Sequence, residues 1–158
     1  MMAAHEGGRG EGRLTLREAR SAGDLREVMA IRRLVFTDEQ HLTDVVDRDP
    51  YDRGPGAVQA LAFWDERPVG VGRLHVAHGD GQIAWVAVLP DYRGLGVGWE
   101  IMDGLLAAAG QLGAHRVTLS AQTHAREFYH LLGFHTVGTV WTMAGIEHIT
   151  MVRDLDGS

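Results

Sequence analysis

The chain contains no cysteine among its 158 residues. This absence excludes disulfide bonds, thiolate metal sites and a cysteine nucleophile, and it is compatible with a reducing compartment. No apolar run approaches the roughly 20 residues that a membrane span requires, and the N-terminal residues lack the apolar middle of a signal peptide. We therefore expect a cytoplasmic protein without a membrane partner.

Basic residues are outnumbered: 15 Lys and Arg stand against 21 Asp and Glu, which gives a formal net charge of -6. Non-specific nucleic-acid binding depends on neutralising phosphates with Lys and Arg, so nucleic acid is not an expected partner. Hydrophobic residues make up 45% and charged residues 23% of the chain. These values are typical of a globular domain.

The chain reads as one domain without a linker or an internal repeat. Residues 1–13 are rich in glycine and have little to bury, so we interpret them as a disordered tail that precedes a domain over 14–155. The alternation over 14–18 predicts a strand, and the capping-box spacing of Ser21 and Asp24 predicts a helix over about 24–36. The acidic stretch 37–53 is expected to be a surface loop with one helical turn.

Apolar runs and turn signals predict the remaining elements. Three runs separated by short turns predict an antiparallel meander over 57–64, 69–76 and 83–89. Helical spacing begins at Val97 and stops near Gly110 and Gly113. Further elements are expected as a strand at 116–120, a helix at 123–132, and strands at 134–141 and 146–153. Strands that come first and then alternate with helices indicate a mixed α/β fold around one sheet.

The most informative segment is VAVLPDYRGLGVG at 86–98, where an apolar strand leads into a glycine-rich turn and a helix. Glycines let backbone N–H groups approach a ligand closely, and the first turn of a helix leaves its N–H groups unpaired. These features favour a phosphate or pyrophosphate site, and Arg93 adds a charge that can fork onto phosphate oxygens. A glycine-rich turn with a purely structural role is the alternative.

Two common phosphate-binding motifs do not fit this segment. A P-loop requires GK[ST], and no lysine follows these glycines. A dinucleotide-binding fold requires GxGxxG and an acidic residue about 20 residues further on. Here the spacing is GxGxG, and 116–121 contains no acidic residue.

Four segments, in order along the chain, resemble the GNAT family, the GCN5-related N-acetyltransferases. RGLGVG at 93–98 is similar to the RxxGxG/A pyrophosphate signature of that family, and AQTHAREFYHLLGF at 121–134 is similar to its second signature. VFTDEQ at 35–40 and GIEHITM at 145–151 resemble the ElaA-like branch. Together these matches span most of the proposed domain.

The resemblance implies a central, mostly antiparallel sheet that splays apart between its fourth and fifth strands, with helices on both faces. It also implies transfer of an acetyl group from acetyl-CoA to a primary amine of a small molecule or peptide, directly and in a ternary complex. Carried over, the residues that bind acetyl-CoA are Val86, Ala87, Val88, Arg93, Gly94, Leu95, Gly96, Val97, Gly98 and Gln122. Gln122 departs from the asparagine that is common in the family.

The resemblance further assigns Tyr129 to the position of the general acid. A phenol with an ordinary pKa near 10 stays protonated at neutral pH and can donate to the departing sulfur. The alternative is a tyrosine that packs in the core beside Phe128. A backbone N–H near Val88 is expected to polarise the thioester carbonyl.

The general base is left open among Glu39, His75, His148 and a chain of water molecules. Each of these side chains can accept a proton or orient a water, and the branch resemblance favours Glu39 and His148. The carboxylates of the acidic loop over 38–52 are expected to attract a cationic amine such as a polyamine, an amino sugar or a basic peptide end. A solvated charged loop is the alternative.

The nine histidines do not form zinc-type pairs, so no metal is expected. Two other functions remain open. One is a non-catalytic acyl-CoA-binding module that regulates a partner, and the other is a nucleotide-binding fold of another family. An exposed last strand would also allow a homodimer.

Overall fold

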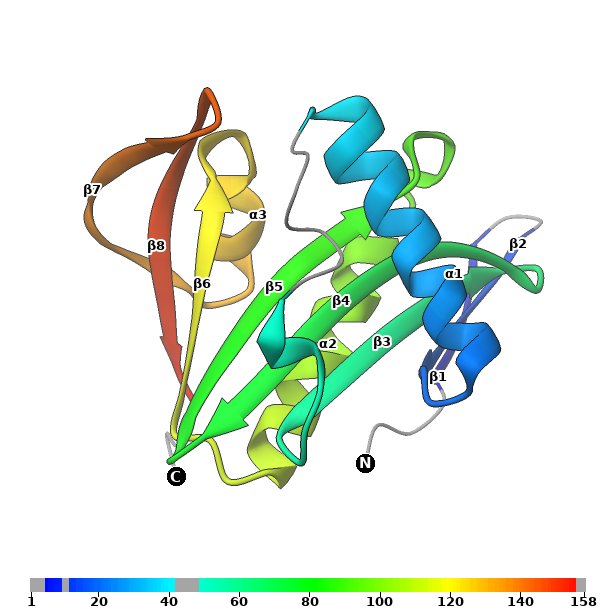
Figure 1. The fold of residues 1–158 in the computed structure, drawn as a ribbon, viewed down its shortest axis with the longest axis horizontal. Helices are drawn as coiled ribbons and strands as arrows, with labels where there is room; N and C mark the ends of the chain where they lie inside the picture. The colour runs from blue at the N-terminus through cyan, green and yellow to red at the C-terminus, as the bar shows by residue number, and fades with distance from the viewer. Residues whose placement is uncertain (1–4, 10–11, 42–48, 156–158) are drawn as a thin grey trace.

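One sheet of eight strands runs through the molecule in the order β1-β2-β3-β4-β5-β6-β8-β7 (Figure 1). The computed structural model describes residues 5–9, 12–41 and 49–155. Neighbouring strands are antiparallel throughout this order except for the parallel pair β5 and β6. The strands are β1 His5–Arg9, β2 Gly12–Glu18, β3 Ala57–Trp64, β4 Arg67–Ala77, β5 Asp80–Val88, β6 Arg116–Gln122, β7 His135–Met143 and β8 Ile146–Asp154.

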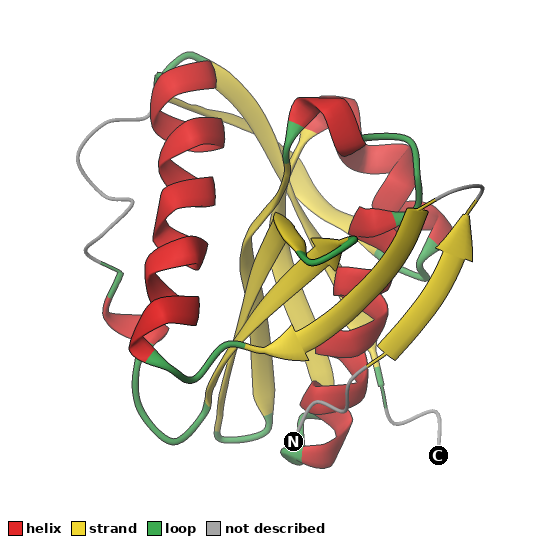
Figure 2. Ribbon diagram, turned by 90° about the vertical axis from the view of Figure 1, so that its right-hand side faces the viewer, coloured by secondary structure: helices red, strands yellow, loops and turns green. Residues whose placement is uncertain are grey.

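Helices cover both faces of the sheet, and Figure 2 shows them on opposite sides of the strands. Helix α1 spans Ala22–Arg32 and continues as the π-helical segment η1, Arg33–Glu39. On the other face lie α2, Val97–Gln111, and the short α3, Arg126–Leu131. Short single turns in the described residues are η2 Pro50–Asp52, η3 Pro90–Tyr92 and η4 Thr123–Ala125.

Most of the expected elements are confirmed, and the differences have local causes. The helix expected from residue 24 begins at Ala22, because the Ser21 side chain caps it by accepting a hydrogen bond from the Asp24 amide at 3.0 Å. The helix expected over 123–132 is split into η4 and α3. In the acidic stretch the expected helical turn is η2, while residues 42–48 lie outside the described part of the chain.

The expectation of a disordered tail over 1–13 is not met where the structure describes these residues. β1 pairs with β2 from His5 opposite Leu16 to Arg9 opposite Gly12. An edge strand is held by its backbone hydrogen bonds and needs few apolar side chains, so the apolar pattern of the sequence does not indicate it. Residues 1–4 and 10–11 lie outside the described residues.

Two apolar cores form, one on each face of the sheet. On the α1 face, Val28, Ile31, Val35 and Phe36 pack against β3, β4 and β5. On the α2 face the core is larger and includes most of the apolar side of α2. Gly72 of β4 lets α2 approach closely, because a Cβ there would lie 2.7 Å from Ile101 Cγ2 and 2.9 Å from Leu105 Cδ1. This close packing holds the start of α2 beside the end of β5.

β5 and β6 pair over only part of their length and then separate (Figure 1). Their parallel register runs from Asp80 opposite Arg116 to Ile83 opposite Leu119. Beyond these residues β5 continues beside β4, whereas β6 continues beside β8. The opening between the two diverging strand ends is called the wedge below.

A β-bulge lies in β5 at the mouth of the wedge. Arg73 faces Ala84 and Val71 faces Ala87, so Trp85 and Val86 oppose Gly72 alone. Trp85 has a φ of 59°, a left-handed conformation that costs a non-glycine residue on the order of 1–3 kcal/mol. Bulges of this kind re-aim side chains next to functional sites. Here Trp85 packs with the core of the α1 face and Val86 with that of the α2 face.

Candidate active site

A cavity of about 920 Å³ fills the wedge. It is lined by the last half of β5, the turn over 93–98, the start of α2, α3, the end of β6, η1, and parts of β7 and β8. All the residues predicted to bind a cofactor line it, with the exception of Leu95. The splay of the sheet therefore brings together segments that lie far apart in the sequence.

The floor of the wedge is a row of backbone groups on β5. The Leu89 amide donates to Val69 on β4 at 2.9 Å, so by the alternation of a strand the N–H groups of Val86 and Val88 point the other way, toward the wedge. β6 pairs with β5 only as far as Ile83, so these groups have no partner in the ladder. An extended polar chain can take the place of the missing strand.

The turn that follows β5 has the geometry of an anion site. Gly94 and Gly96 have φ angles of 78° and 89°, which favour glycine. Gly96 caps α2 without a side-chain hydrogen bond, so the first N–H groups of this 15-residue helix keep their capacity to bind an anion. These observations support the phosphate interpretation over a purely structural turn.

Arg93 lies at the end of the wedge and holds two segments together. Its Nε donates to the Val88 carbonyl at 2.9 Å, and its two terminal nitrogens donate to the two Glu39 carboxylate oxygens, both at 2.8 Å. The hydrogen bonds from Arg93 lower the pKa of Glu39 below its ordinary value. A carboxylate held in this way is a poor proton acceptor, which argues against Glu39 as the base.

Replacing Glu39 with glutamine is expected to distinguish an ion-pair partner of Arg93 from a catalytic base. Glutamine pairs more weakly with the Arg93 guanidinium and leaves it freer to bind an anion. We therefore expect KM for acetyl-CoA, the cosubstrate that the sequence resemblance implies, to fall by up to about fivefold, which matches the free energy of a solvent-exposed ion pair. kcat should change little. Steady-state kinetics measures both, and Asp38→Asn, a change in the neighbouring exposed carboxylate, is the control. A hundredfold loss of kcat in Glu39→Gln would instead identify a base.

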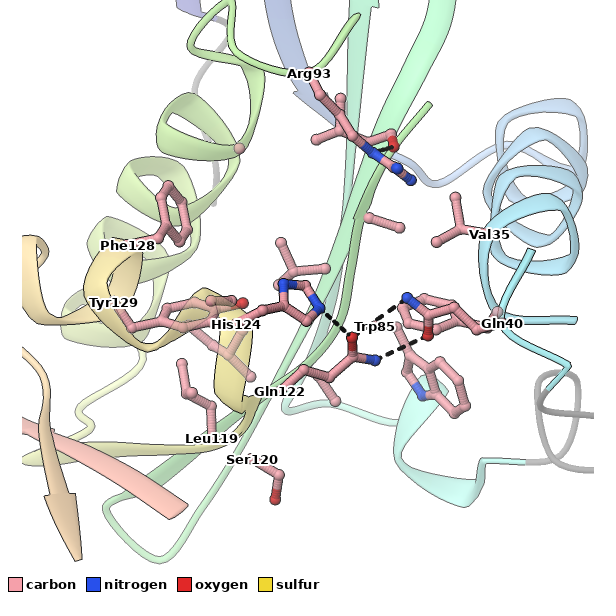
Figure 3. A pocket seen from close by; sticks show the side chains of 18 of the residues that line it. Val35, Gln40, Trp85, Arg93, Leu119, Ser120, Gln122, His124, Phe128 and Tyr129 are labelled. Atoms are coloured by element: carbon pink, nitrogen blue, oxygen red, sulfur yellow. Dashed lines mark hydrogen bonds between the residues drawn. The ribbon is translucent and has the colours of Figure 1, made fainter. Parts of the chain in front are cut away.

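Gln122 stands at the end of β6, where its side chain is held from two sides (Figure 3). Its Nε2 donates to Gln40 Oε1 at 2.8 Å, and its Oε1 lies 2.8 Å from His124 Nε2. A carbonyl oxygen only accepts, so His124 donates through that nitrogen. The Gln40–Gln122 contact bridges the wedge between η1 and β6.

Tyr129 projects from α3 with its hydroxyl directed into the cavity (Figure 3). Its ring meets Phe128 and Phe134 edge-on, with centroids 5.0 and 6.0 Å away. Burial among these rings raises the pKa of the phenol to about 12. The ring thus packs on the core beside Phe128, as expected for a core tyrosine. Its hydroxyl also faces the cavity, as a general acid requires.

Of the three proposed side-chain bases, His148 is best placed to accept a proton, because it lines the cavity and its Nδ1 is hydrogen-bonded. It is 5% exposed, and its Nδ1 lies 2.9 Å from the Ile146 carbonyl oxygen. Because that oxygen only accepts, Nδ1 carries the proton and Nε2 of the neutral ring keeps a lone pair. Trp141 stacks on the ring at 4.8 Å with an interplanar angle of 17°. His75 is not among the residues that line the cavity; its ring packs against Tyr51 at 4.5 Å.

The expectation that the acidic loop offers free carboxylates is wrong for Asp49 and Asp52. Asp52 accepts hydrogen bonds from both terminal nitrogens of Arg32 at 2.8 and 2.9 Å. Asp49 Oδ2 accepts from Arg73 at 2.6 Å and from the Trp85 indole at 2.8 Å. Asp44 and Asp47 lie outside the described residues.

These four charged residues form a buried cluster that the sequence analysis missed. Arg32 and Arg73 are 0% and 1% exposed. Burial alone raises the pKa of Asp49, but hydrogen bonds from Trp85 and Tyr51 and the charges of Arg73 and Arg32 outweigh it, so this pKa is lowered. The one available signal was Arg73, an arginine within the apolar run of β4. The cluster fixes the loop beneath the sheet and anchors the Trp85 side chain.

Within 5–9, 12–41 and 49–155, no group of three or more histidine, aspartate or glutamate side chains is arranged to hold a metal ion. In the same residues, no helix combines the length and apolar character needed to cross a membrane.

Comparison with known proteins gives consistent matches. A family model described as the acetyltransferase (GNAT) domain matches residues 35–155. The uncharacterized N-acetyltransferase YjcF of Bacillus subtilis is 33% identical over 138 residues, which are 86% of this chain and 96% of that protein. Another Bacillus subtilis protein, YyaT, is 29% identical over 143 residues, which are 90% of this chain and 97% of YyaT.

Solved structures share the whole fold. The crystal structure of Escherichia coli ElaA superposes with a TM-score of 0.80 at 26% identity and covers 89% of this chain and 99% of its own. An acyl-CoA N-acyltransferase from Pseudomonas aeruginosa gives a TM-score of 0.77 at 28% identity, with 89% and 98% covered. These neighbours confirm the expected mixed sheet with its splayed parallel pair.

Proposed function

The chain belongs to the GNAT family of acetyltransferases and has ElaA-like relatives, and from this premise we propose that it transfers an acetyl group from acetyl-CoA to a primary amine. The observation that carries the proposal is the wedge itself. It combines strand amides without a partner in the ladder, a helix start without a side-chain cap and a tyrosine hydroxyl in one cavity of about 920 Å³.

The residues present fit coenzyme A. The amides of Val86 and Val88 are placed to pair with the amide-bearing pantetheine chain, as a neighbouring strand would. The turn over 93–98 would bind the pyrophosphate through the first N–H groups of α2. Arg93 borders the same turn, and because its terminal nitrogens are paired with Glu39, the helix N–H groups would make the phosphate contacts while that pair stays intact. Acetyl-CoA supplies the acetyl group as a thioester.

Each remaining task of the reaction has a candidate residue. The amine must lose a proton, and His148 Nε2 would accept it directly or through a water. The amine nitrogen bonds to the carbonyl carbon, and the carbon–sulfur bond breaks. Tyr129 would give its hydroxyl proton to the leaving sulfur. A strand N–H of β5 would stabilise the negative charge that develops on the carbonyl oxygen.

Direct transfer requires that both substrates be held together, and residues from both faces of the sheet line the cavity. Holding two reactants in a near-attack arrangement provides effective molarities of about 10⁵ M or more, so positioning supplies much of the rate. No side-chain nucleophile is needed for this mechanism. A non-catalytic acyl-CoA-binding module would use the same turn but would not need the Tyr129 hydroxyl or His148 Nε2.

The composition of the chain removes two sources of background from an assay for acetyl transfer that detects free CoA. There is no cysteine to react with a thiol reagent, and the 15 basic residues are all arginine, so no lysine can be acetylated by the protein itself. We expect calorimetry to detect acetyl-CoA binding and a thiol reagent to detect free CoA only when an amine is added. Binding without amine-dependent CoA release would identify a regulatory module.

A pair of glycine variants tests the site of the pyrophosphate. Gly94 and Gly138 have φ angles of 78° and 77°, and a Cβ at either position would meet nothing within 4 Å. Valine therefore strains the backbone equally at both positions, but only Gly94 lines the cavity. We expect Gly94→Val to raise the Kd for acetyl-CoA by about tenfold or more, roughly 1.4 kcal/mol, and Gly138→Val to leave it unchanged. Equal effects would remove the turn from the binding site.

A further inference from the structure

The wedge has two chemically different faces, and strand pairing assigns each lining side chain to one of them. Gln122 faces His148, and His148 faces Trp141, across antiparallel pairs. Directly opposed residues place their side chains on the same face of a sheet. Because Gln122 contacts Gln40 next to η1, all three side chains lie on the α1 face.

Of the groups proposed to bind or act on the cofactor, Gln122 and Ala87 lie on the α1 face, and the others named next belong to the other face. Val86, Val88 and Tyr129 pack with the core of the α2 face, where α2 begins and α3 lies. Trp85 and Ile146 pack with the core of the α1 face. If the pyrophosphate is bound at the start of α2, as proposed above, the α1 face is the side from which a second substrate reaches the thioester.

The α1 face of the cavity is apolar and aromatic. Phe36 and Trp85 meet edge-to-face with ring centroids 5.1 Å apart. Trp141 stacks on His148, and Met143 follows on the same strand face. The polar side chains beside these rings include the paired amides of Gln40 and Gln122 and the His148 ring.

No free negative charge balances this face among the described lining residues. Glu39 is the one carboxylate that lines the cavity in this part of the chain, and Arg93 neutralises it. Asp49 and Asp52, which lie beneath Trp85, are paired with Arg73 and Arg32. A second ammonium group on a substrate would therefore lose its water without gaining a counter-charge.

We propose that the α1 face of the wedge, lined by Phe36, Trp85, Trp141, Met143 and His148, is an acceptor subsite for a primary amine carried on an aromatic or other apolar body with no second cationic group. The apolar body is buried among the rings, and the faces of tryptophan attract a single ammonium until it gives up its proton. His148 lines the same cavity and is the proposed acceptor for that proton. This inference rests on the proposed acetyl transfer and names the substrate class of that reaction.

Matched amines test the substrate class. Hexylamine and 1,6-diaminohexane differ only in the second ammonium, and 2-phenylethylamine adds a ring. With amine-dependent CoA release as the readout, we expect kcat/KM for hexylamine and 2-phenylethylamine to exceed that for 1,6-diaminohexane and spermidine by tenfold or more. A diamine or spermidine that matches or exceeds hexylamine overturns the inference while leaving acetyl transfer intact. If acetyl-CoA binds but none of the four amines causes CoA release, both the substrate class and the proposed acetyl transfer are overturned.

Two variants on one strand locate the subsite. Trp141 and Val140 are 37% and 45% exposed on the edge strand β7, but only Trp141 lines the cavity. We expect Trp141→Ala to raise KM for 2-phenylethylamine about tenfold with KM for acetyl-CoA unchanged, Trp141→Phe to restore most of this loss, and Val140→Ala to have no effect. An effect of Trp141→Ala on kcat alone would overturn the subsite and leave Trp141 as a support for the His148 ring.

Discussion

Replacement of Asp52 with asparagine is expected to destabilise the fold by about 3–5 kcal/mol, the usual cost of removing one partner from a buried ion pair. Asp52 accepts two hydrogen bonds from Arg32, whose side chain has 0% exposure, and lies 3.6 Å from Arg73 Nε. Asparagine keeps the shape of the side chain but removes the charge, so two buried guanidinium groups would share the single carboxylate of Asp49. Urea denaturation measures the loss, and Tm should fall by about 10 °C.

Two further variants make this result interpretable. Asp38→Asn changes an exposed carboxylate in the same acidic stretch and should alter the free energy of unfolding by less than about 0.5 kcal/mol. The double variant Arg32→Met/Asp52→Leu removes both partners and should regain at least half of the loss, because well-packed apolar residues often replace a buried pair without penalty. A loss in Asp52→Asn no larger than that in Asp38→Asn would show that the cluster adds nothing to stability.

Replacement of Tyr129 with phenylalanine is expected to reduce kcat for acetyl transfer by about 100-fold or more, the contribution of a positioned general acid. The variant keeps the ring contacts with Phe128 and Phe134, so the free energy of unfolding and the KM for acetyl-CoA should stay nearly constant. Tyr51→Phe is the control, since Tyr51 is 48% exposed and does not line the cavity. Turnover near the wild-type rate would remove Tyr129 from the mechanism.

The pH profile gives a second test of Tyr129. Burial raises the pKa of its phenol to about 12, so the protonated, donating form persists through the whole neutral and mildly alkaline range. The rate should therefore rise with pH as the amine and the base lose protons, and no falling limb should appear below about pH 11. Tyr129→Phe should lower the profile without moving its rising limb. A falling limb near pH 10 would indicate an exposed phenol or a different acid.

Elements with a local sequence signal were predicted correctly. The glycines of the turn over 93–98, the Ser21 cap and the three apolar runs of the meander depend on residues a few positions apart, and each is found as expected. The family motifs belong to the same category, since each is a short segment with fixed spacing. β1 was not predicted, because its pairing depends on backbone groups rather than on a side-chain pattern.

The roles of individual charged residues could not be predicted in the same way. Glu39 was a candidate base, but it is held by Arg93, which is 54 positions away in the sequence. Asp49 and Asp52 look like solvent-exposed carboxylates in a polar loop, and the partners that neutralise them come from α1 and β4. A carboxylate looks the same in the sequence whether its partner is water or a buried arginine.

The sequence by itself determined the family, the order of most of the elements and the turn that is suited to a diphosphate, because these follow from neighbouring residues and backbone preferences. Only the tertiary structure decided which side chains share the wedge and which face of it they occupy. The divergence of β5 from β6 after Ile83, the bulge at Trp85 and the register of β6, β8 and β7 set that arrangement. A shift of one residue in any of these pairings would turn His148 or Trp85 to the opposite face, so their placement depends on strand pairing across the whole sheet.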